Sequence, residues 1–138
     1  NKKNIIADVH DPNAFNINYK LAHAGLFAST DGLARTFLNF NEKLGLLDNI
    51  TKELNSGAFE RFVYGWDRVT DLETSLAGNL AGSLTFGHLG FTGTSIWIDP
   101  EKEIGALLLT NATKNYWYHK DRLNFLRKSF YNLIWSVF

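Results

Sequence analysis

The 138-residue sequence contains no cysteine. This absence excludes a disulfide scaffold and any metal site built from thiolates, and it leaves the redox compartment open. No run of 18 apolar residues occurs, so we expect no membrane span. Fourteen basic residues balance 14 acidic ones. No global field therefore favours nucleic acid, an anionic membrane or a highly acidic substrate as a partner.

Signatures of a serine nucleophile are also missing. No serine is followed by lysine three residues later, and neither Tyr-x-Asn, Ser-x-Asn nor Gly-x-Ser-x-Gly occurs. The four histidines lack metal-ligand spacing, so we expect no metal site. The chain begins at Asn1 without Met or a following apolar stretch, and we expect this to be a cut or processed end.

The sequence does contain 45% apolar residues, enough for a globular core. Residues 1–29 are predicted to be irregular, with a turn at Asp11-Pro12-Asn13. A helix is predicted from Ser29, which can cap it, to Gly45, which can end it. Four apolar residues at helical spacing should form its buried side: Leu33, Phe37, Phe40 and Leu44. A second helix is predicted from Asp48 to about Asn55.

From Phe59 onward the sequence favours strands. Aromatic residues and Gly alternate around Phe62-Val63-Tyr64-Gly65-Trp66, and residues 70–82 form a polar loop. Strands are predicted at 84–89, 94–98 and 104–110, the last two forming a hairpin through Asp99-Pro100. The last of these, apolar on both faces, is predicted to be central. A helix over 119–137 follows, with an apolar stripe: Leu123, Leu126, Phe130, Leu133, Ile134 and Val137.

The most informative segment is FGHLGFTGTSIWIDPE, residues 86–101. A strand ending in Gly-His-Leu-Gly presents a cationic or hydrogen-bonding side chain beside backbone that a ligand can approach closely, because glycines carry no Cβ. The segment therefore has the properties of a cleft wall.

This segment resembles the Lys-Thr-Gly strand of the β-lactamase and penicillin-binding protein superfamily, in the His-x-Gly form of its esterase and peptidase-like members. HAGLFASTDGLAR at 23–35 is similar to the start of a helix in the same family. Tyr64-Gly65-Trp66 resembles the strand before the motif, and Val9-His10-Asp11 a loop of one branch. The resemblance spans residues 9–111 in the family's order, which makes it more specific than any single motif.

The resemblance implies roles for six residues. His88, as a catalytic residue, would take the place of the motif's Lys, and the Phe91 N–H would donate to the oxyanion hole. Substrate-binding positions would be Gly87, Leu89, Gly90 and Thr92. Because Leu89 replaces the motif's Thr and has no hydrogen bond to offer a carboxylate, an ester or other acyl compound is favoured over penicillin or acyl-D-Ala-D-Ala.

The resemblance also implies an α/β (α+β) fold: an antiparallel sheet flanked by helices, the C-terminal half of the β-lactamase or transpeptidase-like fold. Residues 1–138 would form one C-terminal fragment, with 1–58 in the helical subregion and 59–138 forming sheet and final helix. The parent would be a serine hydrolase working through an acyl-enzyme, without metal or organic cofactor. The nucleophile would lie upstream, so the isolated chain should be inactive. A location in the cell envelope or periplasm follows from the resemblance alone.

Several features have simpler structural interpretations. A lone His near a strand end, such as His88, is often a satisfied structural group. His10 and Asp11 are expected to organise a turn. The aromatic cluster Tyr116-Trp117-Tyr118 could stack on a ligand, but such clusters more often cover a core edge. The cations of the last helix, including Arg127, are interpreted as a solvated face.

A different class of function also remains open. A non-catalytic binding or interaction protein could keep the cleft only to hold a ligand. An exposed strand edge could also pair with another chain, because unpaired N–H and C=O groups seek partners. The expected partners are thus a small acyl substrate (ester, amide or lactam), the missing N-terminal half of the same protein, and possible self-association through a sheet edge.

Overall fold

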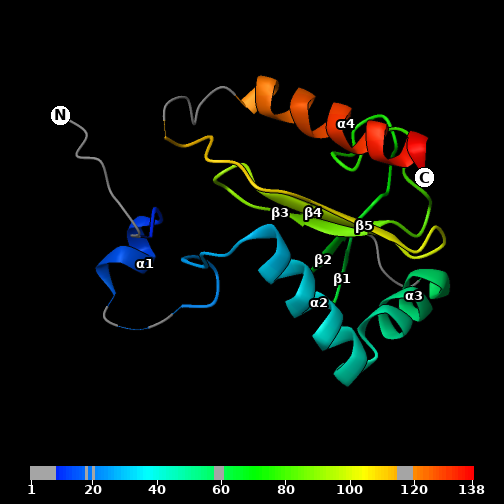
Figure 1. Ribbon diagram of the computed structural model, residues 1–138, viewed down its shortest axis with the longest axis horizontal. Coiled ribbons are helices and arrows are strands. Elements are labelled where there is room, and N and C mark those ends of the chain that lie inside the picture. The colour runs from blue at the N-terminus through cyan, green and yellow to red at the C-terminus, as the bar shows by residue number, and fades with distance from the viewer. Residues whose placement is uncertain (1–8, 18, 20, 58–60, 115–119) are drawn as a thin grey trace.

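The computed structural model describes residues 9–17, 19, 21–57, 61–114 and 120–138. Its centre is an antiparallel sheet in the order β1-β2-β3-β4-β5. Helix α4 lies on one face of this sheet, and α2 and α3 lie toward the other (Figure 1). The predicted α+β class, an antiparallel sheet flanked by helices, is confirmed. Phe59, Tyr116-Trp117-Tyr118 and His119 lie outside the described residues.

Successive hairpins build the sheet. Strands β1 (Phe62–Val63) and β2 (Trp66–Arg68) are joined by Tyr64 and Gly65, both at positive φ, as the tightest hairpin turns require. Strand β3 (Phe86–Leu89) pairs with β2 and with β4 (Ser95–Asp99). Strand β5 (Ile104–Leu108) completes the predicted hairpin with β4.

The hairpin between β4 and β5 is fixed by the carboxylate of Asp99, which is fully buried. Oδ1 accepts from the N–H groups of Glu101 and Lys102, at 3.0 and 3.1 Å. Oδ2 accepts from the Gly82 N–H at 3.2 Å and the Thr85 hydroxyl at 3.3 Å. A buried carboxylate is tolerated here because its oxygens are satisfied.

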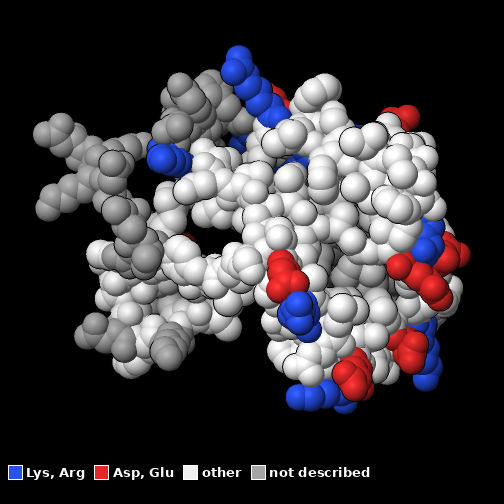
Figure 2. Space-filling view, in the orientation of Figure 1, with Lys and Arg blue, Asp and Glu red and all other residues white. Residues whose placement is uncertain are grey.

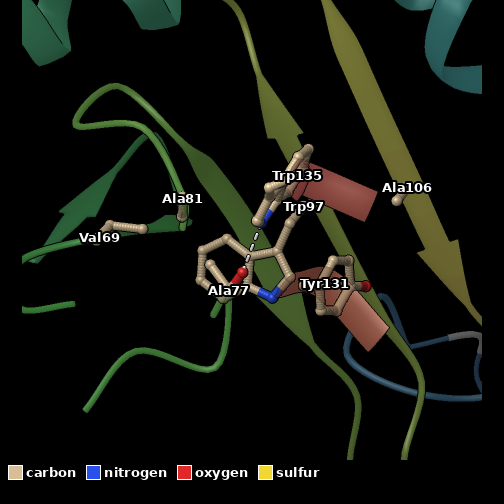
Figure 3. Close-up of a cluster of buried hydrophobic side chains, with 7 residues drawn as sticks. All are labelled: Val69, Ala77, Ala81, Trp97, Ala106, Tyr131 and Trp135. Carbon is tan, nitrogen blue, oxygen red and sulfur yellow. Dashed lines mark hydrogen bonds between the residues drawn. The ribbon is translucent and has the colours of Figure 1, made fainter. Parts of the chain in front are cut away.

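Each face of the sheet has its own core. The α4 side holds a cluster centred on Trp97, which is 1% exposed and which Figure 3 shows with its neighbours. Its other members are Val69, Ala77, Ala81, Ala106, Tyr131 and Trp135. The indole N–H of Trp135 donates to the Ala77 carbonyl at 2.7 Å. On the opposite face the cluster is Ile50, Leu54, Val63, Phe86 and Ile98. Alternate residues of β4 thus enter different cores.

The two predicted N-terminal helices are present. Helix α2 (Thr30–Leu44) begins where the Ser29 hydroxyl accepts from the Gly32 N–H at 3.1 Å, and it ends at Gly45, which is left-handed at φ 58°. Helix α3 (Leu46–Ser56) is slightly longer than predicted. The predicted buried side of α2 is partly wrong, because Phe40 and Leu44 are 50% and 63% exposed. Phe37 does pack against the core.

Other predictions are corrected by the fold. A short helix α1 (Pro12–Asn16) interrupts the region expected to be irregular, because Asp11 caps it by accepting from the Ala14 N–H. Strand β5 is not central: among the described strands it pairs only with β4 and lies at one edge. Its many apolar residues were the misleading signal.

Helix α4 (Lys120–Val137) covers the length predicted, but its buried face agrees only in part with the prediction: Phe130 and Ile134 pack against the core. The residues buried on it are Arg127, Tyr131 and Trp135, spaced four apart. Leu126, Leu133 and Val137, predicted to be buried, are 48%, 62% and 65% exposed. Tyr131 and Trp135 stack beside each other and against the core, so that only part of the predicted stripe faces outward.

Candidate functional site

The end of β3 places the two central candidate residues on opposite faces of the sheet. His88 lies opposite Ile96 on β4, and Leu89 lies opposite Ser95. The His88 side chain is exposed, and its Nδ1 lies 2.9 Å from the Leu89 carbonyl oxygen. His88 is therefore not sealed within a core, and its imidazole can be reached from solvent.

A tight turn follows directly after Leu89. The Gly90 N–H donates to the Thr94 carbonyl at 2.8 Å, and the Gly93 N–H donates to the Gly90 carbonyl at 3.0 Å. Gly93 has φ 102°, a conformation that is unfavourable for residues with a side chain. We call residues 90–94 the β3–β4 turn.

Phe91 lies at the tip of the β3–β4 turn. Its side chain is 65% exposed. Its N–H has no hydrogen-bond acceptor among the residues that the structure describes. An N–H that lacks an acceptor among the described residues, on a largely exposed residue of a structured turn, has the property that an oxyanion donor needs.

The main chain of Thr92 is bound by residues that follow β5. Its carbonyl accepts from the Ala112 N–H at 2.8 Å and from the Thr110 hydroxyl at 3.3 Å. The main chain of Thr92 is therefore engaged in fixing the turn, and its assignment to substrate binding stays a prediction.

Packing within the chain requires glycine at two positions of the motif, Gly87 and Gly90. A Cβ on Gly87 would collide with the Ile96 carbonyl and the Trp97 ring, and one on Gly90 would collide with the Thr94 side chain. The space expected for a ligand is thus occupied by neighbouring residues of the same chain. Their roles in substrate binding stay predictions.

Leu89 points toward α4 and packs against the core on that side. It also lines a cavity of about 310 Å³ beside β2, together with Arg61, Asp67 and Thr70. Arg61 donates to both oxygens of Asp67, through Nε at 3.2 Å and Nη2 at 3.1 Å. The Leu89 side chain adds only apolar surface to this cavity.

The N-terminal segment approaches the turn, which the sequence did not indicate. The ring of His10 lies 5.7 Å from that of Phe91, centroid to centroid. Next to it, Asp11 accepts from the Ala14 N–H and contacts His23 Nε2 at 3.1 Å. These contacts, the Ala14 bond foremost, lower the pKa of Asp11. Asp11 organises local structure as expected, whereas His10 lies at the candidate site.

The environment predicted for Arg127 from the sequence is also wrong. It was assigned to a solvated face, but it is 5% exposed, and its Nη2 donates to the carbonyls of Gly90 and Thr94 at 2.9 and 2.8 Å. The available signal was its spacing of four and eight residues before Tyr131 and Trp135. That pattern places Arg127 on an aromatic stripe.

The charged surface of the described residues shows no feature that would extend the site. On the face seen in Figure 2, cations and anions are interspersed, and neither sign forms a continuous patch. Within the described part of the chain, no cluster of three His, Asp or Glu residues could hold a metal ion. No helix there is long and apolar enough to span a membrane.

Together these features define an α+β protein whose third strand carries an exposed imidazole and is followed by a turn whose Phe91 amide has no acceptor in the part of the chain that the structure describes. A sequence model of the family described as Beta-lactamase matches residues 2–128, and the chain belongs to that family. It is thus β-lactamase-like and penicillin-binding-protein-like, and relatives carry the names of hydrolases.

One such relative is the "N-acetylmuramyl-L-alanine amidase" of Bacillus subtilis (strain 168), 34% identical over 114 residues. Two Escherichia coli proteins, both named "Putative D-alanyl-D-alanine carboxypeptidase", are 33% (O157:H7) and 34% (strain K12) identical over 114 and 119 residues. Each match covers 75% of this chain and 26% of the relative. The chain therefore spans about a quarter of these relatives' length. No solved structure matches the chain significantly.

Proposed function

We propose that this chain forms one wall of the active site of a serine hydrolase that works through an acyl-enzyme. The attacking serine would belong to another part of the full-length protein, since no Ser-x-x-Lys motif occurs in this chain. The observation that carries the proposal is the exposed His88 near the end of β3, followed three residues later by the Phe91 N–H, which has no acceptor among the described residues.

Each residue has a distinct chemical task in this proposal. The Phe91 N–H would donate to the carbonyl oxygen as negative charge develops on it, next to the nucleophile's own N–H. His88 would hold or transfer a proton near the reacting centre. In the deacylation step, water attacks the acyl carbonyl, the serine oxygen leaves, and the proton returns to that oxygen.

The substrate class we propose is a small acyl compound, an ester, amide or lactam. Leu89 supplies no hydrogen bond for a substrate carboxylate, which favours esters over acyl-D-Ala-D-Ala peptides. The names of the relatives, an amidase and two carboxypeptidases, favour amide substrates instead. A chromogenic ester and an acyl-D-Ala-D-Ala peptide should therefore be compared as substrates.

The first test is covalent labelling. We expect a serine-reactive fluorophosphonate to label the full-length protein, which should also hydrolyse a p-nitrophenyl ester. The isolated 138-residue chain should do neither. Turnover by the isolated chain would show that the nucleophile is placed wrongly, and a full-length protein that binds an ester without labelling would favour a non-catalytic binding function.

The second test concerns His88. In the full-length protein, His88→Ala should lower kcat for the ester about 10²- to 10⁴-fold, the usual contribution of an acid–base group. His23→Ala is the matched control, because His23 is exposed and contacts Asp11 instead. Full turnover by His88→Ala, with the control also unchanged, would remove His88 from the mechanism.

A further inference from the structure

Arg127 is a buried cation without a carboxylate partner among the described residues. Burial lowers the pKa of its guanidinium. Removing such a charge from water costs free energy unless strong hydrogen bonds compensate for the loss. A buried cation kept at this place on α4 therefore calls for an explanation in terms of what it binds.

What it binds is the β3–β4 turn. Nη2 of Arg127 donates to the carbonyls of Gly90 and Thr94, at 2.9 and 2.8 Å. These two residues also close the turn through the bond from the Gly90 N–H to the Thr94 carbonyl. One side chain on α4 thus holds both ends of a turn that lies more than 30 residues earlier in the chain.

The geometry of the peptide bond connects this contact to Phe91. The Gly90 carbonyl and the Phe91 N–H belong to one planar trans peptide, so they point in opposite directions. When Arg127 draws the Gly90 oxygen toward α4, the Phe91 N–H must point away from α4. A cationic donor on the carbonyl also polarises the peptide and strengthens its N–H as a donor.

We propose that Arg127 is a positioning residue, which fixes the peptide between Gly90 and Phe91 so that the Phe91 N–H is aimed at the substrate's oxyanion. This inference rests on the proposed function and deepens it, because it explains how the amide is preorganised. A donor that is already oriented needs no reorganisation when charge develops, and orientation should therefore affect the transition state more than substrate binding.

The test uses the full-length protein with Arg127→Met, which keeps side-chain length but has no donor, and Arg127→Lys, which keeps a charged donor. With a p-nitrophenyl ester, Arg127→Met should lower kcat about 10- to 100-fold while KM changes less than about threefold. This loss is smaller than the 10²- to 10³-fold expected for removing an oxyanion donor outright. Arg127→Lys should recover part of the loss. Lys120→Met, exposed at the start of the same helix, should match wild type.

Hydrogen exchange supplies a measurement independent of activity. In Arg127→Met, the Gly90 and Gly93 amides should exchange faster, because their bonds close the turn, while the amides of β4 and β5 keep their wild-type rates. Unchanged kcat, or unchanged exchange at Gly90 and Gly93, would overturn the inference. So would a uniform rise in exchange across β3, β4 and β5, which would mean that Arg127 only stabilises the sheet.

Failure of the proposed function can be distinguished from failure of the inference about Arg127. If the wild-type full-length protein is neither labelled by a fluorophosphonate nor active on the ester, the hydrolase assignment fails. The exchange measurement would still decide whether Arg127 holds the turn.

Discussion

At the scale of single residues, the buried Tyr131 makes the stability of the protein depend on pH. Tyr131 is fully buried, and its hydroxyl donates to the Ser95 hydroxyl at 2.9 Å. Desolvation raises the pKa of Tyr131 to about 12, although the Ser95 bond and the Arg127 charge oppose the shift. The unfolded chain would titrate near pH 10. Between these two pH values the folded state keeps a proton that the unfolded state has lost.

This difference predicts a loss of stability at alkaline pH. Stability falls with rising pH wherever the folded state binds more protons. The contribution is fully present below pH 10 and is lost as the pH approaches 12, for a total of roughly 2–3 kcal/mol. Unfolding midpoints of the protein should drop over this interval, and those of Tyr131→Phe should drop less. Equal pH dependence of the two proteins would contradict the pKa of Tyr131.

The role of a residue could be predicted from the sequence when its hydrogen-bond partners lie nearby in the chain, and not when they lie far away. The predicted Ser29 cap depends on an N–H three positions away, and it is found. Asp11, predicted only to organise a turn, caps α1 through an N–H equally close in the chain. Arg127 depends on carbonyls 37 and 33 positions away. No local pattern reports such a contact, so its cation was assigned to solvent.

At the scale of elements, a left-handed glycine joins two helices. Gly45 ends α2 and precedes α3 at φ 58°, and its N–H donates to the Asn41 carbonyl at 2.9 Å. An added Cβ would meet only Asn49, at 3.8 Å, so space does not forbid a side chain there. The backbone conformation does, because alanine is strained in the left-handed region.

Gly45→Ala should therefore destabilise the protein by about 1–2 kcal/mol. Gly57 offers a matched comparison, because it is also left-handed, at φ 67°, with nothing within 4 Å of an added Cβ. Thermal unfolding of both alanine variants against wild type measures the two costs. A Gly45→Ala protein as stable as wild type would show that this helix junction relaxes to another conformation.

Helix and strand positions were predictable, whereas the faces they bury were not. Caps and apolar spacing placed α2, α3 and α4 within a few residues. The face of α4 that packs depends on Trp97, which lies on a strand and contacts Tyr131 and Trp135. The predicted stripe shares the packed side of the helix only in part, because Phe130 and Ile134 pack against the core whereas Leu126 and Leu133 are exposed.

At the scale of the whole molecule, apolar surface is left exposed on two sides. On α4 it includes Phe125, Leu126 and Leu133, and on α2 it includes Leu38 and Leu44. Strand β5 has one described neighbour, so its other edge offers unpaired backbone groups. Exposed apolar side chains and open strand edges of this kind are found at sites of association. The relatives are about four times as long as the part they share with this chain.

We expect the isolated 138-residue chain to self-associate. Edge pairing through β5 supplies backbone hydrogen bonds, while the apolar surfaces of α2 and α4 should bind the dye ANS. Size-exclusion chromatography at increasing concentration should show species larger than a monomer, and the full-length protein should bind less dye per molecule. A monomer with weak dye binding would contradict the prediction.

A substitution on α4 can show whether the chains associate through the β5 edge or through this helix. Leu133→Lys places a charge on the outward face of α4, where the leucine is 62% exposed, without touching β5. Association through the β5 edge should survive this change, since backbone groups make it, whereas association through α4 should be lost. Ser129→Lys is the matched control on the same helix, because Ser129 is exposed and polar. Loss of association in Leu133→Lys, but not in the control, would move the interface from the sheet edge to the helix.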